Sequence, residues 1–134
     1  MITIGALALC VIAYMIIGML WYSPLLFGNI WAKLTGRGSE NMQMEDMTRI
    51  YLLSSISSLV MAFVLNYVMT EVEVQNISQA LLVGFMLWLG FAFTSTTVNN
   101  LFQGRPRRLI FIDSGYFLAS SLAMSAILFF MMYP

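Results

Sequence analysis

The chain has 134 residues, of which 60% are hydrophobic and only 9% are charged, and its six basic and six acidic residues cancel. Soluble domains carry about 25% charged residues, so this composition excludes a water-soluble fold, and the balanced charge excludes a nucleic-acid-binding protein, which needs a basic surface. Because the chain has no histidine and a single cysteine, we expect no enzymatic activity, no cofactor and no metal ion, but one integral membrane domain over residues 1–134.

Four apolar stretches are long enough to cross a bilayer core about 30 Å thick, which takes roughly 20 helical residues. They are Ile2–Trp21, Ile50–Met69, Ile77–Val98 and Leu109–Tyr133, and only the last contains a charged residue, Asp113. Such long runs without alternation are typical of helices, because lipid offers no partner to unpaired backbone groups. The first run lacks the basic start and the cleavage site of a secretory signal, so we interpret it as a retained span. The predicted fold class is all-α, a transmembrane four-helix bundle.

The first connection is predicted to contain a short helix of its own. Ser23 and Pro24 are typical of a helix start, as N-cap and first helical residue, and apolar residues at helical spacing follow them. Gly36 is typical of a helix end. We therefore predict an amphipathic helix over about residues 24–35 that lies in the membrane interface, followed by a polar hinge over residues 36–46.

The third connection and the small residues indicate close helix packing. Gly104 and Pro106 predict a tight turn between the third and fourth spans. Small residues recur every four positions, a spacing that lets helix backbones approach closely in lipid. Either packing within one bundle or contact between copies explains this pattern, which comprises Ser54/Ser58/Ala62, Ala80/Gly84, Gly90/Thr94 and Gly115/Ala119/Ala123.

The basic residues predict the orientation of the four spans. All six lie in the first and third connections, at Lys33, Arg37, Arg49, Arg105, Arg107 and Arg108. The second connection, Thr70–Asn76, and both termini contain none. The positive-inside rule therefore places the first and third connections in the cytoplasm and both termini outside.

Asp113 is the one charged residue inside a predicted span. An intramembrane carboxylate is costly and marks a candidate functional site. At 1.5 Å per residue it lies about 7 Å beyond Arg108, near the cytoplasmic interface, where the helix dipole also favours a negative charge. We expect an ion pair with a basic residue of the connections, first of all Arg105 or Arg108. A role in proton or cation handling is the alternative.

Asn99 and Asn100 close the third predicted span, and two tryptophans flank the first connection. Paired amides at a helix end cap free carbonyl groups or contact a ligand or ion. Trp21 and Trp31 lie where aromatic side chains anchor a protein in the membrane interface.

Many polar residues belong to one membrane depth, where the first and third spans end and the second and fourth begin. On the fourth span, Asp113, Tyr116 and Ser120 share a helix face at i, i+3 and i+7. The outer half offers only scattered polar residues. We therefore predict a polar vestibule on the cytoplasmic side, although capping and helix contacts explain the same residues. Its members are Tyr22, Ser23, Thr96, Asn99, Asn100, Asp113 and Tyr116.

Two motifs in the chain resemble those of a known family. The first is Trp21-Tyr22-Ser23-Pro24 with Leu-Leu-Phe-Gly and Trp31 after it, and the second is Trp88-Leu89-Gly90-Phe91 followed by Asn99-Asn100-Leu101-Phe102, Arg105 and Gly115-Tyr116. Over nearly its whole length the chain resembles the bacterial membrane proteins grouped as domain of unknown function 1761. The resemblance implies four transmembrane helices in a bacterial inner membrane, and it brings no assigned activity and no catalytic residues.

Two functions are consistent with these features. The first is a binding or accessory membrane component, a homo-oligomer or a subunit of a membrane complex, whose cytoplasmic face contacts membrane lipids or a partner. The second is a homo-oligomeric small transporter or channel for an ion or small solute, with Asp113 and Asn100 near the mouth of a pore between subunits. The apolar outer half of the chain favours the first.

Overall fold

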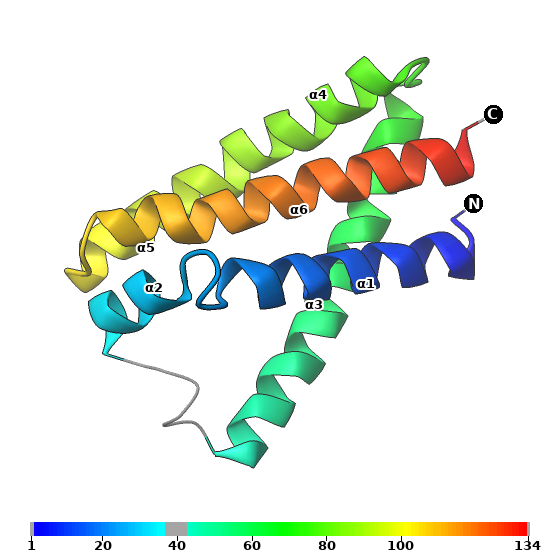
Figure 1. Cartoon of the computed structure of the whole chain (residues 1–134). Helices are drawn as coiled ribbons and strands as arrows, with labels where there is room; N and C mark the ends of the chain where they lie inside the picture. The colour runs from blue at the N-terminus through cyan, green and yellow to red at the C-terminus, as the bar shows by residue number, and fades with distance from the viewer. Residues whose placement is uncertain (1, 37–42, 134) are drawn as a thin grey trace.

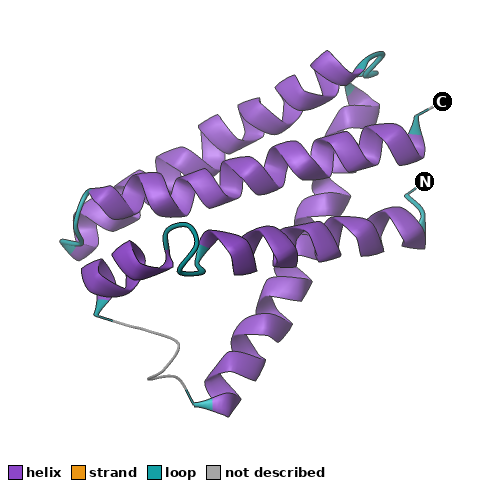
Figure 2. Ribbon diagram, viewed as in Figure 1, coloured by secondary structure: helices purple, strands orange, loops and turns teal. Residues whose placement is uncertain are grey.

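The computed structural model describes residues 2–36 and 43–133. In chain order its elements are α1 (Ile4–Trp21), α2 (Gly28–Thr35), α3 (Met44–Glu71), α4 (Ile77–Leu87), the π-helical segment η2 (Trp88–Phe93), α5 (Thr94–Gln103) and α6 (Arg108–Met132) (Figure 1). The regular structure of the described residues is entirely helical (Figure 2). Four helices in these ranges are long and apolar enough to cross a membrane: Ile4–Trp21, Met44–Glu71, Ile77–Gln103 and Arg108–Met132. The predicted all-α fold is confirmed, and the chain is a multi-pass membrane protein.

Helix α6 lies at the centre of the bundle and contacts every other element. Its buried residues extend from Leu109 to Leu128, whereas α1 buries Ala6, Cys10 and Tyr14 on one face. Figure 1 shows α1 along one side of α6 and α4 with α5 along the other, while α3 crosses them obliquely. Many large apolar side chains face outward, as expected where the surrounding lipid is as apolar as the side chains themselves.

Small residues let α4 and α6 approach closely. The Ser121 hydroxyl of α6 donates to the carbonyl of Gly84 in α4 at 2.8 Å. A Cβ atom at Gly84 would overlap the Ser125 hydroxyl and lie 3.0 Å from the Ser121 carbonyl. Ala80, four residues before Gly84, is fully buried. The stripe of Ala80 and Gly84 therefore packs within one chain.

The third span is one continuous helix from Ile77 to Gln103 with a π-helical turn, Trp88–Phe93, inside it. The helix continues beyond Val98, the predicted end of the span, through the two asparagines that follow. The helix ends at Gly104, which adopts the left-handed conformation (φ 66°). Such a residue at a helix end is most often glycine, because it has no Cβ atom to clash.

The connection after α1 is tighter than predicted. The Ser23 carbonyl accepts hydrogen bonds from the N–H groups of Leu26 (3.1 Å) and Gly28 (2.9 Å). A Cβ atom at position 28 would overlap the backbone of Tyr22 and Ser23, so this close return of the chain requires glycine. The amphipathic helix therefore begins at Gly28, and the predicted start at Pro24 is wrong. Its end, followed by a left-handed glycine at position 36, is as predicted.

Helix α3 begins earlier than its apolar run. The run starts at Ile50, but the helix starts at Met44 and has Glu45 and Asp46 in its first turn, where the helix dipole stabilises negative charge. The predicted polar hinge over residues 36–46 is therefore wrong for its last three residues. Its positions 37–42 lie outside the described residues.

Candidate functional site

Asp113 joins three parts of the chain at one end of the bundle. Its Oδ1 accepts a hydrogen bond of 2.8 Å from the Tyr22 hydroxyl, directly after α1. Its Oδ2 lies 3.8 Å from Nη2 of Arg105, in the turn between α5 and α6. The side chains of Asp113 and Arg105 are 19% and 36% exposed, so the ion pair alone contributes no more than about 1 kcal/mol. We refer to Tyr22, Arg105 and Asp113 as the Asp113 cluster.

The turn before α6 positions Arg105. The N–H groups of Gly104 and Arg105 donate to the carbonyls of Leu101 and Asn100, at 3.2 Å each. These two bonds form a Schellman motif, which returns the chain at the end of a helix. Arg105 is thereby brought over the start of α6. Arg108, the other expected partner of the carboxylate, is exposed and forms no ion pair within the described ranges.

Two tryptophans hold α6 through its backbone. The Trp21 indole N–H, at the end of α1, donates to the Ile112 carbonyl at 2.8 Å. The Trp88 indole N–H, from the π-helical turn, donates to the Ser114 carbonyl at 2.7 Å. Gly115 makes room for the first indole, since a Cβ atom there would lie 2.9 Å from the Trp21 ring. Trp21 therefore packs between helices, and its role as an interfacial anchor stays a prediction.

An aromatic cluster continues from Tyr22 into the bundle. The buried Tyr116 hydroxyl donates to the Tyr14 carbonyl of α1 at 2.9 Å, and Gly18 leaves the space that this hydroxyl occupies. The ring centroids of Tyr14 and Tyr116 are 5.0 Å apart, and Tyr22 meets both Tyr116 and Trp31 edge-on at 5.5 Å. These distances are typical of favourable aromatic pairs. Trp31, the second predicted anchor, therefore contacts the ring that binds the aspartate.

Asn100 is the buried amide of the site, with 2% exposure. Its Nδ2 donates to the Pro106 carbonyl at 3.2 Å, while its Oδ1 is buried and has no hydrogen-bond partner among the described residues. An unpaired buried acceptor costs about 1–3 kcal/mol, so this oxygen is a candidate contact for a bound donor. Asn99 is exposed and Thr96 half-buried, and neither side chain forms a hydrogen bond in the described part of the chain.

The predicted vestibule is thus only partly assembled around one point. Tyr22 contacts both Asp113 and Tyr116, whereas the Ser23 hydroxyl donates back to the Leu20 carbonyl of its own loop at 2.7 Å. The polar groups that do meet bond to one another or to backbone carbonyls. The arrangement is therefore a packed polar cluster in which, among the described residues, Oδ1 of Asn100 and the Ser120 hydroxyl are buried without a hydrogen-bond partner.

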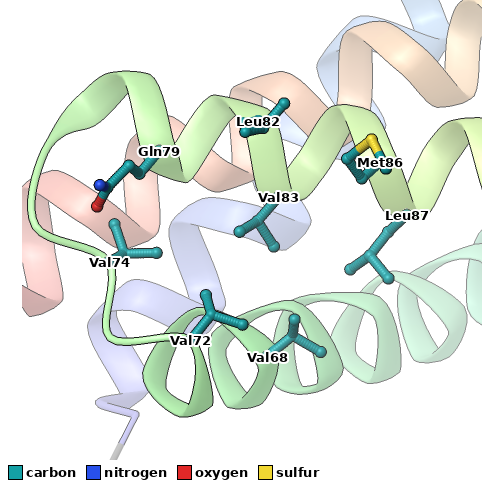
Figure 3. A pocket seen from close by; sticks show the side chains of 8 residues that line it. All are labelled: Val68, Val72, Val74, Gln79, Leu82, Val83, Met86 and Leu87. Atoms are coloured by element: carbon teal, nitrogen blue, oxygen red, sulfur yellow. The ribbon is translucent and has the colours of Figure 1, made fainter.

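Two surface grooves on the described residues have apolar walls. One separates the end of α3, at Val68 and Val72, from Leu82 and Met86 of α4, with Gln79 nearby (Figure 3). It lies at the opposite end of the bundle from Asp113, and its walls fit the hydrocarbon chains of lipid. The described residues contain no group of three histidine, cysteine or acidic side chains able to hold a metal ion.

Four residues of this site were not predicted as site residues: Tyr14, Gly18, Trp88 and Ser114. The spacing Tyr14, Gly18, Trp21 and Tyr22 follows i, i+4, i+7 and i+8, which is one face of a helix, and this pattern was the available signal. The acceptors on α6 are backbone carbonyls, and the π-helical turn has no sequence signature, so nothing in the sequence pairs Trp88 with Ser114.

A bundle of long apolar helices, with a polar cluster closed at one end, defines a small multi-pass membrane protein. Residues 5–129 match the family model described as "Protein of unknown function (DUF1761)", so the chain belongs to that family. The resemblance seen in the two motifs is confirmed. No curated protein and no solved structure matches the chain.

Proposed function

We propose that the protein is a binding or accessory component of a bacterial inner membrane, which contacts a lipid or protein partner and does not move a solute. The main support for this proposal is that both carboxylate oxygens of Asp113 already have partners within the protein. One oxygen accepts a hydrogen bond from the Tyr22 hydroxyl, and the other faces the Arg105 guanidinium. Carboxylates that relay protons or ions line a pathway of further polar groups. Deeper in the bundle, the hydroxyls of Ser121 and Ser125 bond to backbone carbonyls instead, and the buried Ser120 hydroxyl is an isolated polar group without a partner among the described residues.

One observation favours a second candidate, the homo-oligomeric transporter or channel. Oδ1 of Asn100 is buried without a partner among the described residues, and an amide oxygen accepts a hydrogen bond from a solute or coordinates a cation. The described grooves on a single copy are apolar, so a pore in this second candidate lies between copies.

The proposed function is tested by native mass spectrometry of the protein purified in mild detergent. We expect a lipid or protein partner to co-purify with the wild type and with Asn99→Leu, and to be lost from Asn100→Leu. Position 99 is the matched control because Asn99 is exposed, whereas Asn100 is buried. If Asn100→Leu is destabilised but keeps every bound species, Asn100 has a purely structural role.

A flux assay separates the two candidates. The protein is reconstituted into vesicles, and the movement of protons and monovalent cations is followed with dyes. We expect no flux above that of empty vesicles. A flux that Asp113→Asn abolishes would establish the transporter instead.

The orientation belongs to the same proposal and rests on the six basic residues of the first and third connections. Single cysteines are placed at Gln43, Gln103 and Gln75 in a Cys10→Ala background. An impermeant thiol reagent added to intact cells should label position 75 and spare positions 43 and 103. Labelling at position 103 would reverse the assigned orientation.

A further inference from the structure

The described residues bury no side chain in the first half of α3. The buried residues of this helix are Ser58, Ala62, Leu65 and Met69, all in its second half. Figure 1 shows the first half extending away from the rest of the bundle. A helix of 28 residues spans about 42 Å, which is more than the roughly 30 Å of a bilayer core, so an inclined α3 still crosses the membrane.

The packed face of α3 continues into this unpartnered half. Stepping back from Ser58 by intervals of three or four residues leads to Ser54, Tyr51 and Met47, which lie on the same side of the helix. Leu53 and Ile56 lie on the opposite side and are 55% and 50% exposed. The two faces of the helix differ in side-chain size. Ser54 and Ser58 are small enough to let the backbone of a second helix approach closely.

Complementary charges lie at the same end of the bundle. Glu45 and Asp46 occupy the first turn of α3 and are exposed, and Arg107 and Arg108 are exposed directly before and at the start of α6. None of the four forms an ion pair within residues 2–36 and 43–133. Helices α3 and α6 begin on the same side of the membrane, because an even number of spans separates their starts. Figure 1 shows these two starts well apart within one copy.

We propose that the first half of α3 is a self-association surface whose occupant is a second copy of this chain. The face of Met47, Tyr51 and Ser54 packs against the bundle of the second copy. Glu45 and Asp46 then meet Arg107 and Arg108 of that copy. A two-fold axis forms both contacts at once, because each copy offers one acidic turn and one basic turn. The surface includes no residue of the Asp113 cluster, although Arg107 and Arg108 follow Arg105 closely in the chain, so this inference does not depend on the proposed function.

Charge complementarity selects a second copy over lipid as the occupant. Anionic headgroups would satisfy the arginines, but they would repel the two acidic side chains of α3. A second copy satisfies both pairs, at one membrane depth and with no other component.

Cross-linking between two differently tagged copies tests the geometry. In a Cys10→Ala background, one copy carries Asp46→Cys and the other Arg107→Cys, and a short bis-maleimide is added to membranes. We expect a product with both tags. The control pair, Gln75→Cys with Arg107→Cys, lies at opposite ends of the bundle and should give none. A yield no greater than that of the control pair would overturn the proposal.

Charge reversal distinguishes a second copy from lipid. The variant Glu45→Arg/Asp46→Arg should not self-associate, and neither should Arg107→Glu/Arg108→Glu, because like charges then meet at both contacts. Mixed together they should form a heterodimer, since both contacts become complementary. Labelling at position 103 verifies that each variant keeps its orientation. Equal association of all combinations would show that the acidic and basic turns do not meet between copies, and it would reject the proposal.

A bulky substitution tests the helix face independently of charge. Ser54→Trp should convert the dimer to a monomer, as measured by mass in mild detergent, while Ile56→Trp on the opposite side should leave the dimer intact. Equal effects of the two variants would contradict the assigned face. Native mass spectrometry of bound partners, which tests the proposed function, is read separately from this result.

Discussion

The two sides of α6 are held in different ways. Towards α1, large polar-tipped rings reach across: the hydroxyls of Tyr22 and Tyr116 and the indole of Trp21 bond to the other helix. Towards α4, the helices meet directly through small residues, and the Ser121 hydroxyl bonds to the Gly84 carbonyl. The aromatic side chains between α1 and α6 can shift when a neighbouring residue changes. The distance between α4 and α6 is set by direct backbone contact and cannot change in the same way.

This difference follows from the solvent. In lipid there is no hydrophobic gain from bringing two helices together, so a contact needs hydrogen bonds or close packing. The contact between α1 and α6 uses hydrogen bonds, at the end of the bundle where Asp113 lies. The contact between α4 and α6 uses mainly close packing, further along α6. One central helix therefore combines a polar contact near the membrane surface with a close-packed contact deeper in the bundle.

The largest effect is expected for Gly84→Ala. Its Cβ atom would overlap the Ser125 hydroxyl and approach the Ser121 carbonyl, and a backbone carbonyl cannot turn aside. Overpacking of this kind costs about 1–3 kcal/mol, measured as a lower thermal midpoint in detergent. Gly90→Ala is the matched control, since a Cβ atom there meets nothing within 4 Å. Equal midpoints for the two variants would mean that α4 and α6 are not closely packed.

Removing the hydroxyl of Tyr22 is expected to lower the free energy of unfolding somewhat less than Gly84→Ala does. Tyr22→Phe removes the hydrogen bond to the Asp113 carboxylate, and bonds to charged groups contribute about 1.5–3 kcal/mol, reduced here because the carboxylate is partly exposed. Tyr67→Phe is the control, because Tyr67 is 60% exposed. A drop in thermal midpoint that is no larger for Tyr22→Phe than for the control would show that this bond does not hold α1.

The sequence predicts the α4 contact better than the α1 contact. Ala80 and Gly84 are visible as a small-residue pattern with a known meaning in lipid, and apolar runs predict four helices because the bilayer permits little else. In the α1 contact, the bonds of Trp21 and Tyr116 end on backbone carbonyls, which every residue possesses. Their acceptors therefore carry no signal in the sequence.

The errors at helix boundaries have a similar cause. Hydropathy places the start of α3 at Ile50, but the helix dipole accepts the acidic turn that precedes it. Ser23 and Pro24 match a helix start locally, yet the bonds to the Ser23 carbonyl and the close approach at Gly28 delay the helix. Both outcomes depend on backbone interactions that local residue patterns do not contain.

A third prediction compares glycines on the two sides of α6. Gly115→Ala places a Cβ atom 2.9 Å from the Trp21 ring, but a ring edge can shift where a backbone cannot. The expected cost is about 0.5–1.5 kcal/mol, the value of the Trp21 hydrogen bond that the shift breaks. Trp21 fluorescence reports the displacement directly in a variant with phenylalanine at positions 31 and 88. If Gly115→Ala is as harmful as Gly84→Ala, the α1 contact is no more adjustable than the α4 contact.

The smallest effect is expected for the ion pair between Asp113 and Arg105. At 3.8 Å, with both side chains partly exposed, their coupling should be about 0.5–1 kcal/mol. A double-mutant cycle with Asp113→Asn and Arg105→Gln measures it, because residues in contact lose less together than the sum of their separate losses. The same cycle with Arg108→Gln should be additive, since Arg108 forms no ion pair in the described residues. Equal coupling energies for the two arginines would mean that the Asp113 carboxylate interacts with the combined charge of the basic turn. In that case the Schellman motif at Gly104 would not select Arg105, and the polar contact of α6 would depend on general charge instead of one positioned side chain.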